Sequence, residues 1–329
     1  MKHCMKSALL LFGLVAYPAL AAAGAENYPA KPIRIIVPQQ AGGSVDITAR
    51  YLVAQLQVQL NQSIIVDNRP GATGIIGTQV AAKATPDGYT LLYNASNMLI
   101  DQLVNPKHAI DVLSTFAPIS LAVASRGNLV VVNPALRARS VQELIALARS
   151  NDRPLKYGSQ GVGSGQQLLV ETFNLRAGTR LVHVPYKGVP AIITAAINGE
   201  VDVLFINPIA VVPHIKAGRL RAIGYTGSAR WPVMQEIPTV SESGLPGFDN
   251  PQASWHGLFA PLKTPREITM KIYTEVNKAL QVDKVRGALE GGSYFVDGNK
   301  SPDAFRKYIE SDLKRIKEVV DAAKITADS

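Results

Sequence analysis

Cysteine, aromatic residues and clustered charge are all scarce in this chain of 329 residues. The one cysteine, Cys4, lies near the start, so the remainder cannot form a disulfide and must be stabilised by its core. Aromatic residues make up only 6% of the sequence, and the net charge of +9 comes from basic residues that occur singly or in pairs such as Lys314 and Arg315. Because nucleic-acid surfaces need basic clusters and stacking aromatics, we expect no nucleic-acid partner.

Motifs for metal-dependent, nucleotide-dependent and covalent catalysis are missing as well. No histidine has a partner at metal-ligand spacing, and we expect no metal or other cofactor. The glycine-rich segments lack the Gly-Lys-Ser/Thr ending of a P-loop and the spacing of a dinucleotide motif. Ser164 stands outside the Gly-x-Ser-x-Gly register of a hydrolase nucleophile. These absences favour a protein that is not an enzyme, although catalytic groups that meet only in space would leave no such motif.

The first 25 residues differ in character from the rest. Lys2 and Lys6 flank the start, residues 8–16 are nearly all apolar, and small residues fill positions 19–25. This pattern is typical of a secretory signal peptide, whose apolar region is too short to span a bilayer. Losing the two lysines lowers the net charge from +9 to +7. Cleavage could follow any of three alanines, which complete small-x-small sites: Ala21, Ala23 or Ala25. We expect an exported, soluble mature chain.

After this leader, short β-like runs alternate with helix-periodic segments, which predicts an α/β fold with mainly parallel sheets flanked by helices. The expected strands cover residues 33–37, 63–66, 89–93, 155–159, 180–184, 201–206 and 220–225. The expected helices cover residues 45–60, 78–83, 141–149 and 166–175, and others start after Asn207, at the capping box Thr264 to Glu267 and near Ser301. A chain of this length should form two lobes. We assign residues 26–123 and 254–329 to lobe one, and residues 124–253 to lobe two.

The stretch from Pro38 to Asp46, between the first expected strand and helix, carries the clearest functional signal. Gly42 and Gly43 would let the backbone approach a ligand, and Ser44 could cap the helix, whose N-terminus carries partial positive charge. Two related turns follow, at residues 71–77 and 161–165. We interpret these turns as a cradle for a carboxylate. The alternative is that their glycines serve only the shape of tight turns.

Other strand ends also carry small or amide residues, such as Asn94 and Ser96 after the third strand. Ligands in open α/β sheets bind outside the carboxyl ends of strands, so these ends should converge on one crevice. His256 follows Trp255 in the expected return to lobe one, where a wall of the cleft could lie. A structural role for His256 is the simpler interpretation.

Several ordered segments give the chain a resemblance to a known family. They are residues 28–34 (Tyr-Pro-Ala-Lys-Pro-Ile-Arg), 41–46, 66–72 (Val-Asp-Asn-Arg-Pro-Gly-Ala), 86–92 (Pro-Asp-Gly-Tyr-Thr-Leu-Leu), 182–188, 213–218 and 238–248. With these segments the chain resembles the substrate-binding proteins of tripartite tricarboxylate transporters, also called Bug receptors. The resemblance implies a two-lobed, flytrap-like periplasmic receptor that acts as a monomer. Such a receptor closes on a small organic carboxylate and delivers it to membrane transporter subunits.

The expected binding residues combine the turns with the resemblance, which implies that backbone amides of lobe one hold one carboxylate. In lobe one they are Gln39, Gln40, Ala41, Gly42, Gly43, Ser44, Asp46, Gly71, Ala72, Thr73, Gly74, Asn94 and Ser96. In lobe two and the return crossing they are Ser159, Gly163, Ser164, Gly165, Gln166, Ile206, Asn207, Trp255 and His256.

The chain departs from the family pattern at two places. Where many relatives have Pro-Phe-x-Ala-Gly-Gly, this chain has Gln39 and Gln40 after Pro38, so amides replace an aromatic wall. Ile206 stands where many have an aspartate that could bind an ammonium group. We therefore expect a ligand without an amino group, either a dicarboxylate or an acid with an aromatic body, and a tricarboxylate stays open. A secreted hydrolase or isomerase, or a sensor read by a signalling partner, are the alternative functions.

Overall fold

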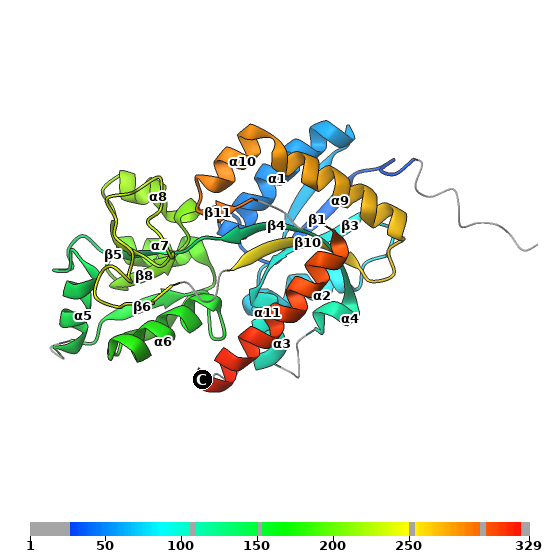
Figure 1. The fold of residues 1–329 in the computed structure, drawn as a ribbon. Coiled ribbons are helices and arrows are strands. Elements are labelled where there is room, and N and C mark those ends of the chain that lie inside the picture. The colour runs from blue at the N-terminus through cyan, green and yellow to red at the C-terminus, as the bar shows by residue number, and fades with distance from the viewer. Residues whose placement is uncertain (1–26, 106–109, 151–152, 250–253, 297–300, 324–329) are drawn as a thin grey trace, which may run out of the picture.

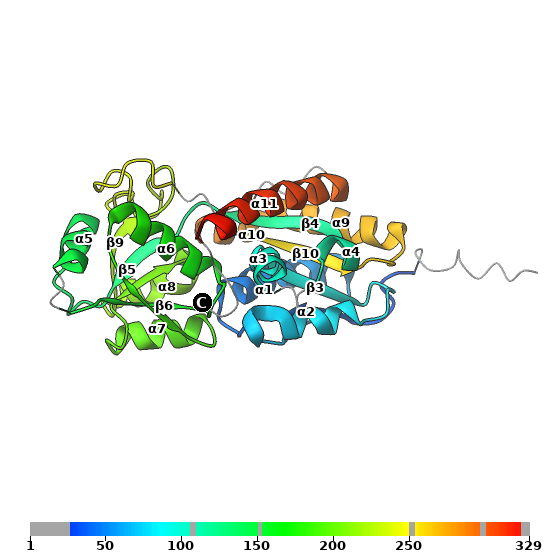
Figure 2. The same ribbon diagram turned by 90° about the horizontal axis from the view of Figure 1, so that it is seen from below.

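The structure, a computed structural model, describes residues 27–105, 110–150, 153–249, 254–296 and 301–323 (Figure 1). Two sheets lie side by side along the molecule, and helices flank each of them (Figure 2). The predicted two-lobed α/β fold is confirmed. The predicted signal peptide and its cleavage sites lie outside the described residues. Within the described ranges, no helix combines the length and apolar character needed to cross a membrane.

Lobe one holds a six-stranded sheet in the order β11-β4-β10-β3-β1-β2. Its strands are β1 (Ile33–Val37), β2 (Ile64–Asn68), β3 (Thr90–Ala95), β4 (Phe116–Ser125), β10 (Trp255–Pro261) and β11 (Tyr294–Phe295). β1 pairs in parallel with β2 and β3, whereas β10 pairs antiparallel with β3 and β4 and β11 with β4. The sheet is mixed because β10, which returns from lobe two, and β11 run against the other strands.

Helices cover both faces of this sheet, since successive side chains of a strand point to opposite faces. Ile33, Ile35 and Val37 pack in one apolar layer, and Ile36 packs in the other. The first layer includes α1 (Ser44–Leu60), α9 (Arg266–Gln281) and α10 (Asp283–Glu290). The second includes α2 (Ile75–Ala82), α3 (Asn97–Val104), α4 (Val112–Thr115) and α11 (Pro302–Ala323), and a short 3-10 turn, Ala72–Gly74, precedes α2.

Lobe two holds a five-stranded sheet in the order β7-β6-β8-β5-β9. Its strands are β5 (Leu129–Val132), β6 (Lys156–Ser159), β7 (Val182–Pro185), β8 (Val203–Ile206) and β9 (Arg221–Tyr225). Only β5, which enters from lobe one, runs against the other strands. One face packs with α5 (Val141–Arg149) and α6 (Gly165–Ala177), and the other with α7 (Val189–Ile197) and α8 (Pro208–Lys216).

Strand direction brings the functional ends of the two sheets together. β4 ends at the crossing into lobe two, and β1, β2 and β3 run in the same direction as β4. In lobe two, β5 leaves the crossing, and the other strands run back toward it. The carboxyl ends of both parallel sets therefore face each other between the lobes, which is where ligands of α/β proteins bind.

Helix starts largely follow the sequence signals. The Ser140 hydroxyl accepts a hydrogen bond from the Glu143 amide at 3.1 Å, and the Asn207 side chain accepts one from the Ile209 amide at 3.0 Å. Both are N-caps of the predicted kind. The predicted limits of the lobes stay a prediction, and β4 runs on to Ser125, just past the expected limit at residue 123.

Three predictions about helix starts were wrong. The N-cap of α1 is Gly43, and Ser44 is the first helical residue, so its hydroxyl does not cap the helix. α9 has Pro265 as its N-cap with no side-chain cap, and the Thr264 hydroxyl makes no hydrogen bond. α2 begins at Ile75, before the expected start at residue 78, because the 3-10 turn leads directly into it.

Candidate functional site

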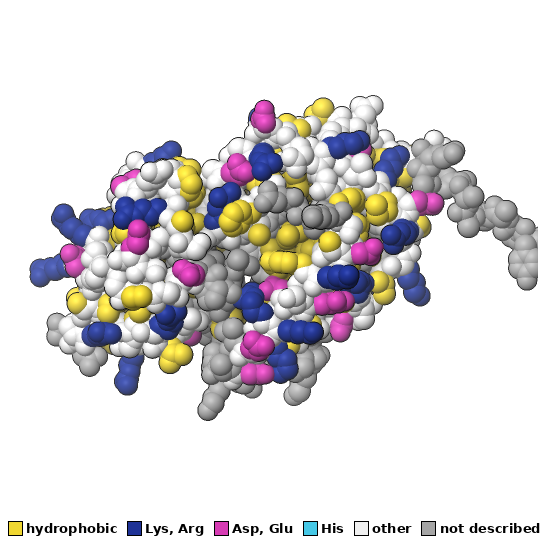
Figure 3. Space-filling model, viewed as in Figure 1, with side chains coloured by type: hydrophobic (Ala, Val, Ile, Leu, Met, Phe, Trp, Pro, Cys, Tyr) yellow, Lys and Arg dark blue, Asp and Glu magenta, His cyan; other side chains and the backbone are white. Residues whose placement is uncertain are grey.

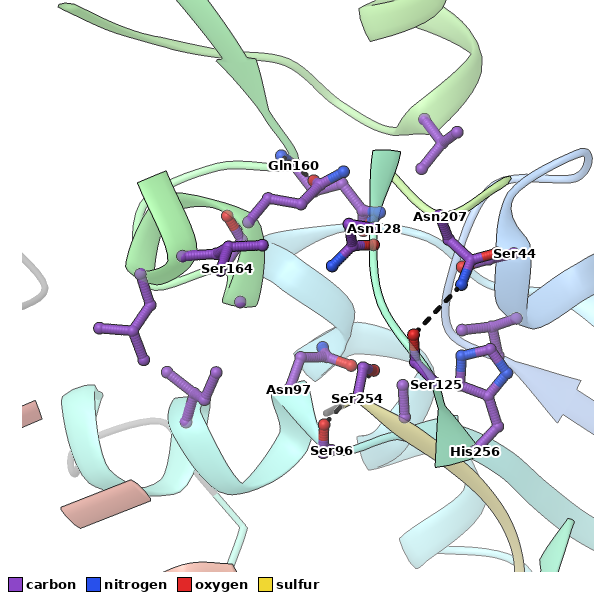
Figure 4. Close-up of a pocket in the computed structure, with 18 of the residues that line it drawn as sticks. Ser44, Ser96, Asn97, Ser125, Asn128, Gln160, Ser164, Asn207, Ser254 and His256 are labelled. Atoms are coloured by element: carbon purple, nitrogen blue, oxygen red, sulfur yellow. Dashed lines mark hydrogen bonds between the residues drawn. The ribbon is translucent and has the colours of Figure 1, made fainter. Parts of the chain in front are cut away.

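A cavity of about 110 Å³ lies between the lobes (Figure 4). Residues from the turn after β1, the turn after β3, both crossings, the turn after β6 and the end of β8 line it. The polar side chains that Figure 4 labels around it are Ser44, Ser96, Asn97, Ser125, Asn128, Gln160, Ser164, Asn207, Ser254 and His256. Apolar side chains of both lobes complete the wall, so the cavity offers polar and apolar surface to one ligand.

Four helices begin at this cavity. Their lining residues are Ser44 and Val45 of α1, Ser96 and Asn97 of the start of α3, Ser164, Gly165 and Gln166 of the start of α6, and the α8 N-cap Asn207. The first backbone N–H groups of a helix have no acceptor within the helix and carry partial positive charge. Four such ends around a small cavity favour an anionic ligand.

Charged side chains are almost absent from the cavity wall. Among the residues that the structure describes, its lining includes no Asp or Glu, and Arg315 of α11 is its one Lys or Arg. His256 is buried, and its Nδ1 lies 2.8 Å from the Thr48 hydroxyl. Burial lowers the pKa of His256 to about 3, so this imidazole is neutral at neutral pH. The positive potential of the cavity thus comes from helix ends and from Arg315.

The turn after β1 is stabilised by the Asp46 side chain, which lies on the side of the turn away from the cavity. Asp46 is buried, and its carboxylate accepts hydrogen bonds from the Gly42 amide at 2.9 Å, from the Arg50 guanidinium and from Asn68. Burial alone would raise the pKa of Asp46, but these donors together hold the pKa below its usual value. Gly42 has a φ of 80°, which disfavours any residue with a side chain. Asp46 therefore shapes the turn and does not face the cavity.

A second turn of lobe one, residues 71–74, has positive φ at every position. The Thr73 hydroxyl donates to the buried Asp101 carboxyl at 2.7 Å, and the Asn97 side chain donates to the Thr73 carbonyl at 2.9 Å. Burial raises the pKa of Asp101 to about 7, although the Thr73 hydrogen bond opposes this shift. These contacts fix a strained turn beside the cavity.

This turn borders a second space, the seam hollow, of about 520 Å³. Gln39, Thr73, Gln160 and Val189 line both the cavity and the seam hollow, so the two adjoin. The remaining lining residues of the seam hollow are Pro38, Gln40, Gly43, Pro70, Gly71, Ala72, Gly74, Gly161, Tyr186, Lys187 and Gly188. The turns of the two lobes therefore meet here with the lobes drawn together.

The turn of lobe two before α6 is satisfied by neutral side chains. Ser164 caps α6 by accepting from the Gln167 amide at 3.3 Å. Gln167 accepts from the Gly163 amide at 2.8 Å, and Gln166 accepts from the Gln160 amide at 3.1 Å. The hydroxyl of Ser159 accepts from the Gly161 amide, also at 3.1 Å. No carboxylate takes part in these bonds.

The structure brings most of the expected site residues to these two spaces. Those at the cavity are Gln39, Ser44, Thr73, Ser96, Ser164, Gly165, Gln166, Ile206, Asn207 and His256. The seam hollow adds Gln40, Gly43, Gly71, Ala72 and Gly74. Their contact with a ligand stays a prediction.

Seven expected site residues line neither space, and their contact with a ligand also stays a prediction: Ala41, Gly42, Asp46, Asn94, Ser159, Gly163 and Trp255. Ala41 and Gly42 are exposed at the tip of their turn. The Asn94 side chain is buried against the Thr78 hydroxyl and the Ala95 amide. Ser159 and Gly163 bond within the lobe-two turn, as Asp46 does behind the lobe-one turn. The Trp255 indole points away into the core and donates to Asp312 at 2.8 Å.

Several lining residues escaped the sequence analysis, among them Asn97, Ser125, Asn128, Gln160, Ser254, Tyr294 and Arg315. Ser125 and Asn128 flank the crossing that the sequence did indicate, and crossings are where clefts form. Arg315 has no local signal, because α11 shows only the periodicity of a structural helix. No group of three His, Cys, Asp or Glu side chains suited to a metal ion occurs within the described ranges.

Comparison with known proteins gives one family. Residues 48–325 match the family model described as "Tripartite tricarboxylate transporter family receptor". The Bordetella pertussis protein BugT is 34% identical over 300 residues, which cover 90% of this chain and 90% of BugT.

Two solved structures are similar over the whole fold. Rhodopseudomonas palustris Rpa4515 with adipate is 31% identical with a TM-score of 0.86, covering 91% of this chain and 99% of that one. MatC from Rhodopseudomonas palustris with bound malate is 27% identical with a TM-score of 0.80, covering 89% of this chain and 100% of that one. The chain therefore belongs to the tripartite tricarboxylate transporter receptor family, whose members are periplasmic solute-binding proteins.

Proposed function

We propose that this protein captures a small organic carboxylate without an amino group in the interlobe cavity and delivers it to the membrane subunits of a tripartite transporter. The observation that carries the proposal is the convergence of four helix N-termini on a cavity whose described lining residues include no acidic side chain. One carboxylate takes its hydrogen bonds from backbone amides there. Charge-assisted bonds contribute about 1.5–3 kcal/mol each, so a few of them suffice for micromolar binding.

The residues that line the cavity also support a ligand without an amino group. Ile206 is buried at the cavity wall, where an aspartate could pair with an ammonium group and an isoleucine cannot. An α-amino group would lose its water there without gaining an acceptor of opposite charge, which is costly. The structures of the relatives with adipate and with malate, two acids without an amino group, support the same class of ligand.

Gln39 and Gln40 have separate parts in this proposal. Gln39 lines both spaces, so it faces the ligand. The Gln40 side chain lies against Gly188 of lobe two, because a Cβ atom at Gly188 would come within 2.6 Å of its Oε1. Gln39 thus serves selectivity and Gln40 serves contact between the closed lobes. Ligand favours this closed state because it binds both lobes at once.

The cellular setting is part of the proposal. The leader directs the chain to the periplasm, where it acts as a monomer that binds ligand without converting it. Incubation with an acid that binds should return that acid unchanged. Formation of a product would replace the receptor with a secreted hydrolase or isomerase.

A thermal-shift screen of the purified protein tests the ligand class, with adipate, malate, citrate, phenylacetate and glutamate as probes. A ligand at a hundred times its dissociation constant stabilises the folded state by about 2.7 kcal/mol. We expect at least one acid without an amino group to raise the melting temperature and glutamate to leave it unchanged. If no carboxylate raises it, the carboxylate cradle is wrong.

Two substitutions at one position sharpen this test. Ile206→Asp places a negative charge beside the bound carboxylate, and Ile206→Asn places an uncharged group of similar shape there. We expect calorimetry to show weaker binding for both, with Ile206→Asp at least tenfold weaker than Ile206→Asn because like charges in a buried site repel strongly. Unchanged affinity in both variants would remove Ile206 from the site.

A further inference from the structure

Within the described part of the chain, Arg315 is the one Lys or Arg side chain on the cavity wall, and it comes from the C-terminal helix α11 of lobe one. Its side chain is 37% exposed, so it lies toward the solvent side of the cavity. A guanidinium in that position keeps part of its hydration. Pairing with an anion there therefore costs less desolvation than in a sealed core.

A buried carboxylate orients this guanidinium. Asp312 accepts hydrogen bonds from Arg315 Nε at 3.0 Å and Arg315 Nη2 at 2.5 Å, both at Oδ1. Its other oxygen, Oδ2, accepts from the Trp255 indole at 2.8 Å. Asp312 and Trp255 are both buried, so the carboxylate cannot turn away without losing a buried partner. Arg315 is thus presented at the cavity by residues that do not touch the cavity themselves.

An apolar wall accompanies Arg315 on the same part of the lining. Ile100 of α3, Leu168 of α6 and Ile316 of α11 all line the cavity and share one apolar cluster. Leu168 belongs to lobe two and the other two belong to lobe one, so this wall is complete only when the lobes are together. Methylene groups of a ligand would gain about 0.8 kcal/mol each from burial against it.

We propose that Arg315 binds the second carboxylate of a dicarboxylate whose first carboxylate is held at the helix N-termini. The apolar wall takes the methylene chain between the two carboxylates. This inference rests on the proposed function, because it assigns the far end of the same ligand. It makes Arg315 the residue that distinguishes a dicarboxylate from a monocarboxylate, with Asp312 as its positioning residue.

Affinity for two probes of equal chain length tests this assignment: adipate, and hexanoate, which lacks the second carboxylate. We expect Arg315→Gln to weaken adipate binding about fivefold in calorimetry, the worth of a half-exposed ion pair of about 1 kcal/mol. Hexanoate binding should change less than twofold. The discrimination between the two acids should therefore fall about fivefold.

Lys317→Gln is the matched control, because it removes the same charge from the same helix at a side chain that is 61% exposed and pairs with Asp321. This variant should keep the affinities for both probes. Arg315→Lys, which keeps the charge but not the fork of donors, should recover part of the discrimination.

The outcomes separate this inference from the proposed function. If Arg315→Gln weakens adipate and hexanoate equally, its role is structural and the assignment is wrong. If wild-type protein binds adipate no better than hexanoate, the second carboxylate has no partner at Arg315, although the receptor function stands. Failure of every carboxylate to bind the wild-type protein would overturn the proposed function itself.

Discussion

The turn before α1 in lobe one and the turn before α6 in lobe two both follow a parallel strand, contain glycines and open onto the cavity, yet they satisfy their backbone amides differently. In lobe one, the carboxylate of Asp46 takes the Gly42 amide, and the N-cap residue Gly43 has no side chain to offer. In lobe two, neutral serine and glutamine side chains take the turn amides, and Ser164 caps the helix.

The difference concerns which amides stay open for a ligand. α1 has no side-chain cap, so its first N–H groups are available at the cavity, where Ser44 and Val45 lie. α6 already gives one of its first amides to Ser164. We therefore expect lobe one to hold the anion more strongly, and lobe two to close on a ligand that lobe one has already bound. A carboxylate can stabilise the turn of lobe one because Asp46 faces away from the cavity and is paired with Arg50.

Removing the Asp46 carboxylate should have the largest effect on stability and on carboxylate binding. Asp46→Ala removes the acceptor of the Gly42 amide and one of the two acceptors of the Asn68 side chain, which keeps the Gln39 carbonyl. We expect a loss of about 3–4 kcal/mol in the free energy of unfolding. Urea denaturation measures this loss, and carboxylate binding should weaken at least tenfold because the turn loses its shape. Asp303→Ala, at a side chain that is 70% exposed, removes the same charge and should cost less than 0.5 kcal/mol.

The pH dependence of this contribution to stability follows from the direction in which folding shifts the pKa of Asp46. The pKa of Asp46 is lower in the folded protein than in the unfolded chain, so its contribution is complete above the unfolded value of about 3.9. It is lost as pH falls through the folded pKa. Wild type and Asp46→Ala should thus converge in stability only in strong acid. A difference in stability between the two proteins that stays constant down to pH 2 would contradict the role of the ionised Asp46 carboxylate.

The turn at residues 71–74 of lobe one is stabilised by the carboxyl of Asp101. Burial raises the pKa of this carboxyl, whereas the pKa of Asp46 is lowered. The pKa of Asp101 is raised to about 7, so the folded protein retains a proton that the unfolded chain releases above about pH 4. Stability should fall as pH rises from 4 to 7 and then level off. Asp101→Asn keeps a neutral acceptor for Thr73, and we expect it to be about 2–3 kcal/mol more stable than wild type at pH 8.

Unfolding of both proteins at pH 4 provides the control for this prediction. Asp101 is protonated there in the folded state, so the two stabilities should agree within about 0.5 kcal/mol. In lobe two, the titratable side chain of His183 contacts the turn, with its Nε2 2.5 Å from the Ser159 hydroxyl. Burial lowers the pKa of His183, the opposite direction to the shift of Asp101. An advantage of Asp101→Asn that is equal at both pH values would mean that Asp101 is ionised in the folded protein.

Local patterns in the sequence were enough to predict most of the fold and one side of the site. The strand at residues 33–37, the Ser140 capping box and the pair Asn207–Pro208 each involve neighbours in the chain, and the structure has them as predicted. The glycine turns were found for the same reason. Thr264 shows the limit of this approach, since its capping box has the right residues but α9 starts with Pro265 as the N-cap.

The lining residues that the sequence missed, and the expected residues that line neither space, depend on contacts between distant segments. Trp255 next to His256 suggested a cleft wall, but its indole reaches Asp312 in the C-terminal helix. The same contact places Arg315 at the cavity, and no pattern within α11 indicates it. Asp46 lies in the predicted turn, but only the fold shows that its carboxylate points behind the turn and not toward a ligand.

Adding a side-chain cap to α1 and removing the cap of α6 test the comparison between the lobes through the smallest expected effects. Gly43 has the extended backbone of an N-cap, with φ of −77° and ψ of 165°, so a serine there can accept from the first turn of α1. That hydroxyl would compete with the ligand for the same amides. We expect Gly43→Ser to bind carboxylate about fivefold more weakly than Gly43→Ala, while being more stable by about 1 kcal/mol. The alanine variant carries the same Cβ, 3.2 Å from the Gln40 carbonyl, and so controls for crowding.

Ser164→Ala is the reciprocal change in lobe two. Loss of its cap should cost about 1 kcal/mol of stability, because the Gln167 amide loses its acceptor. Ser164 lines the cavity, but its hydroxyl oxygen is occupied by the cap, and Gln167 does not line the cavity, so the freed amide is not placed to bind the ligand. We therefore expect the affinity to change less than twofold. Adding a cap in lobe one would then reduce affinity, whereas removing a cap in lobe two would reduce stability. Equal losses of affinity in Gly43→Ser and Ser164→Ala would show that both turns hold the anion alike, and the division between a holding lobe and a closing lobe would fail.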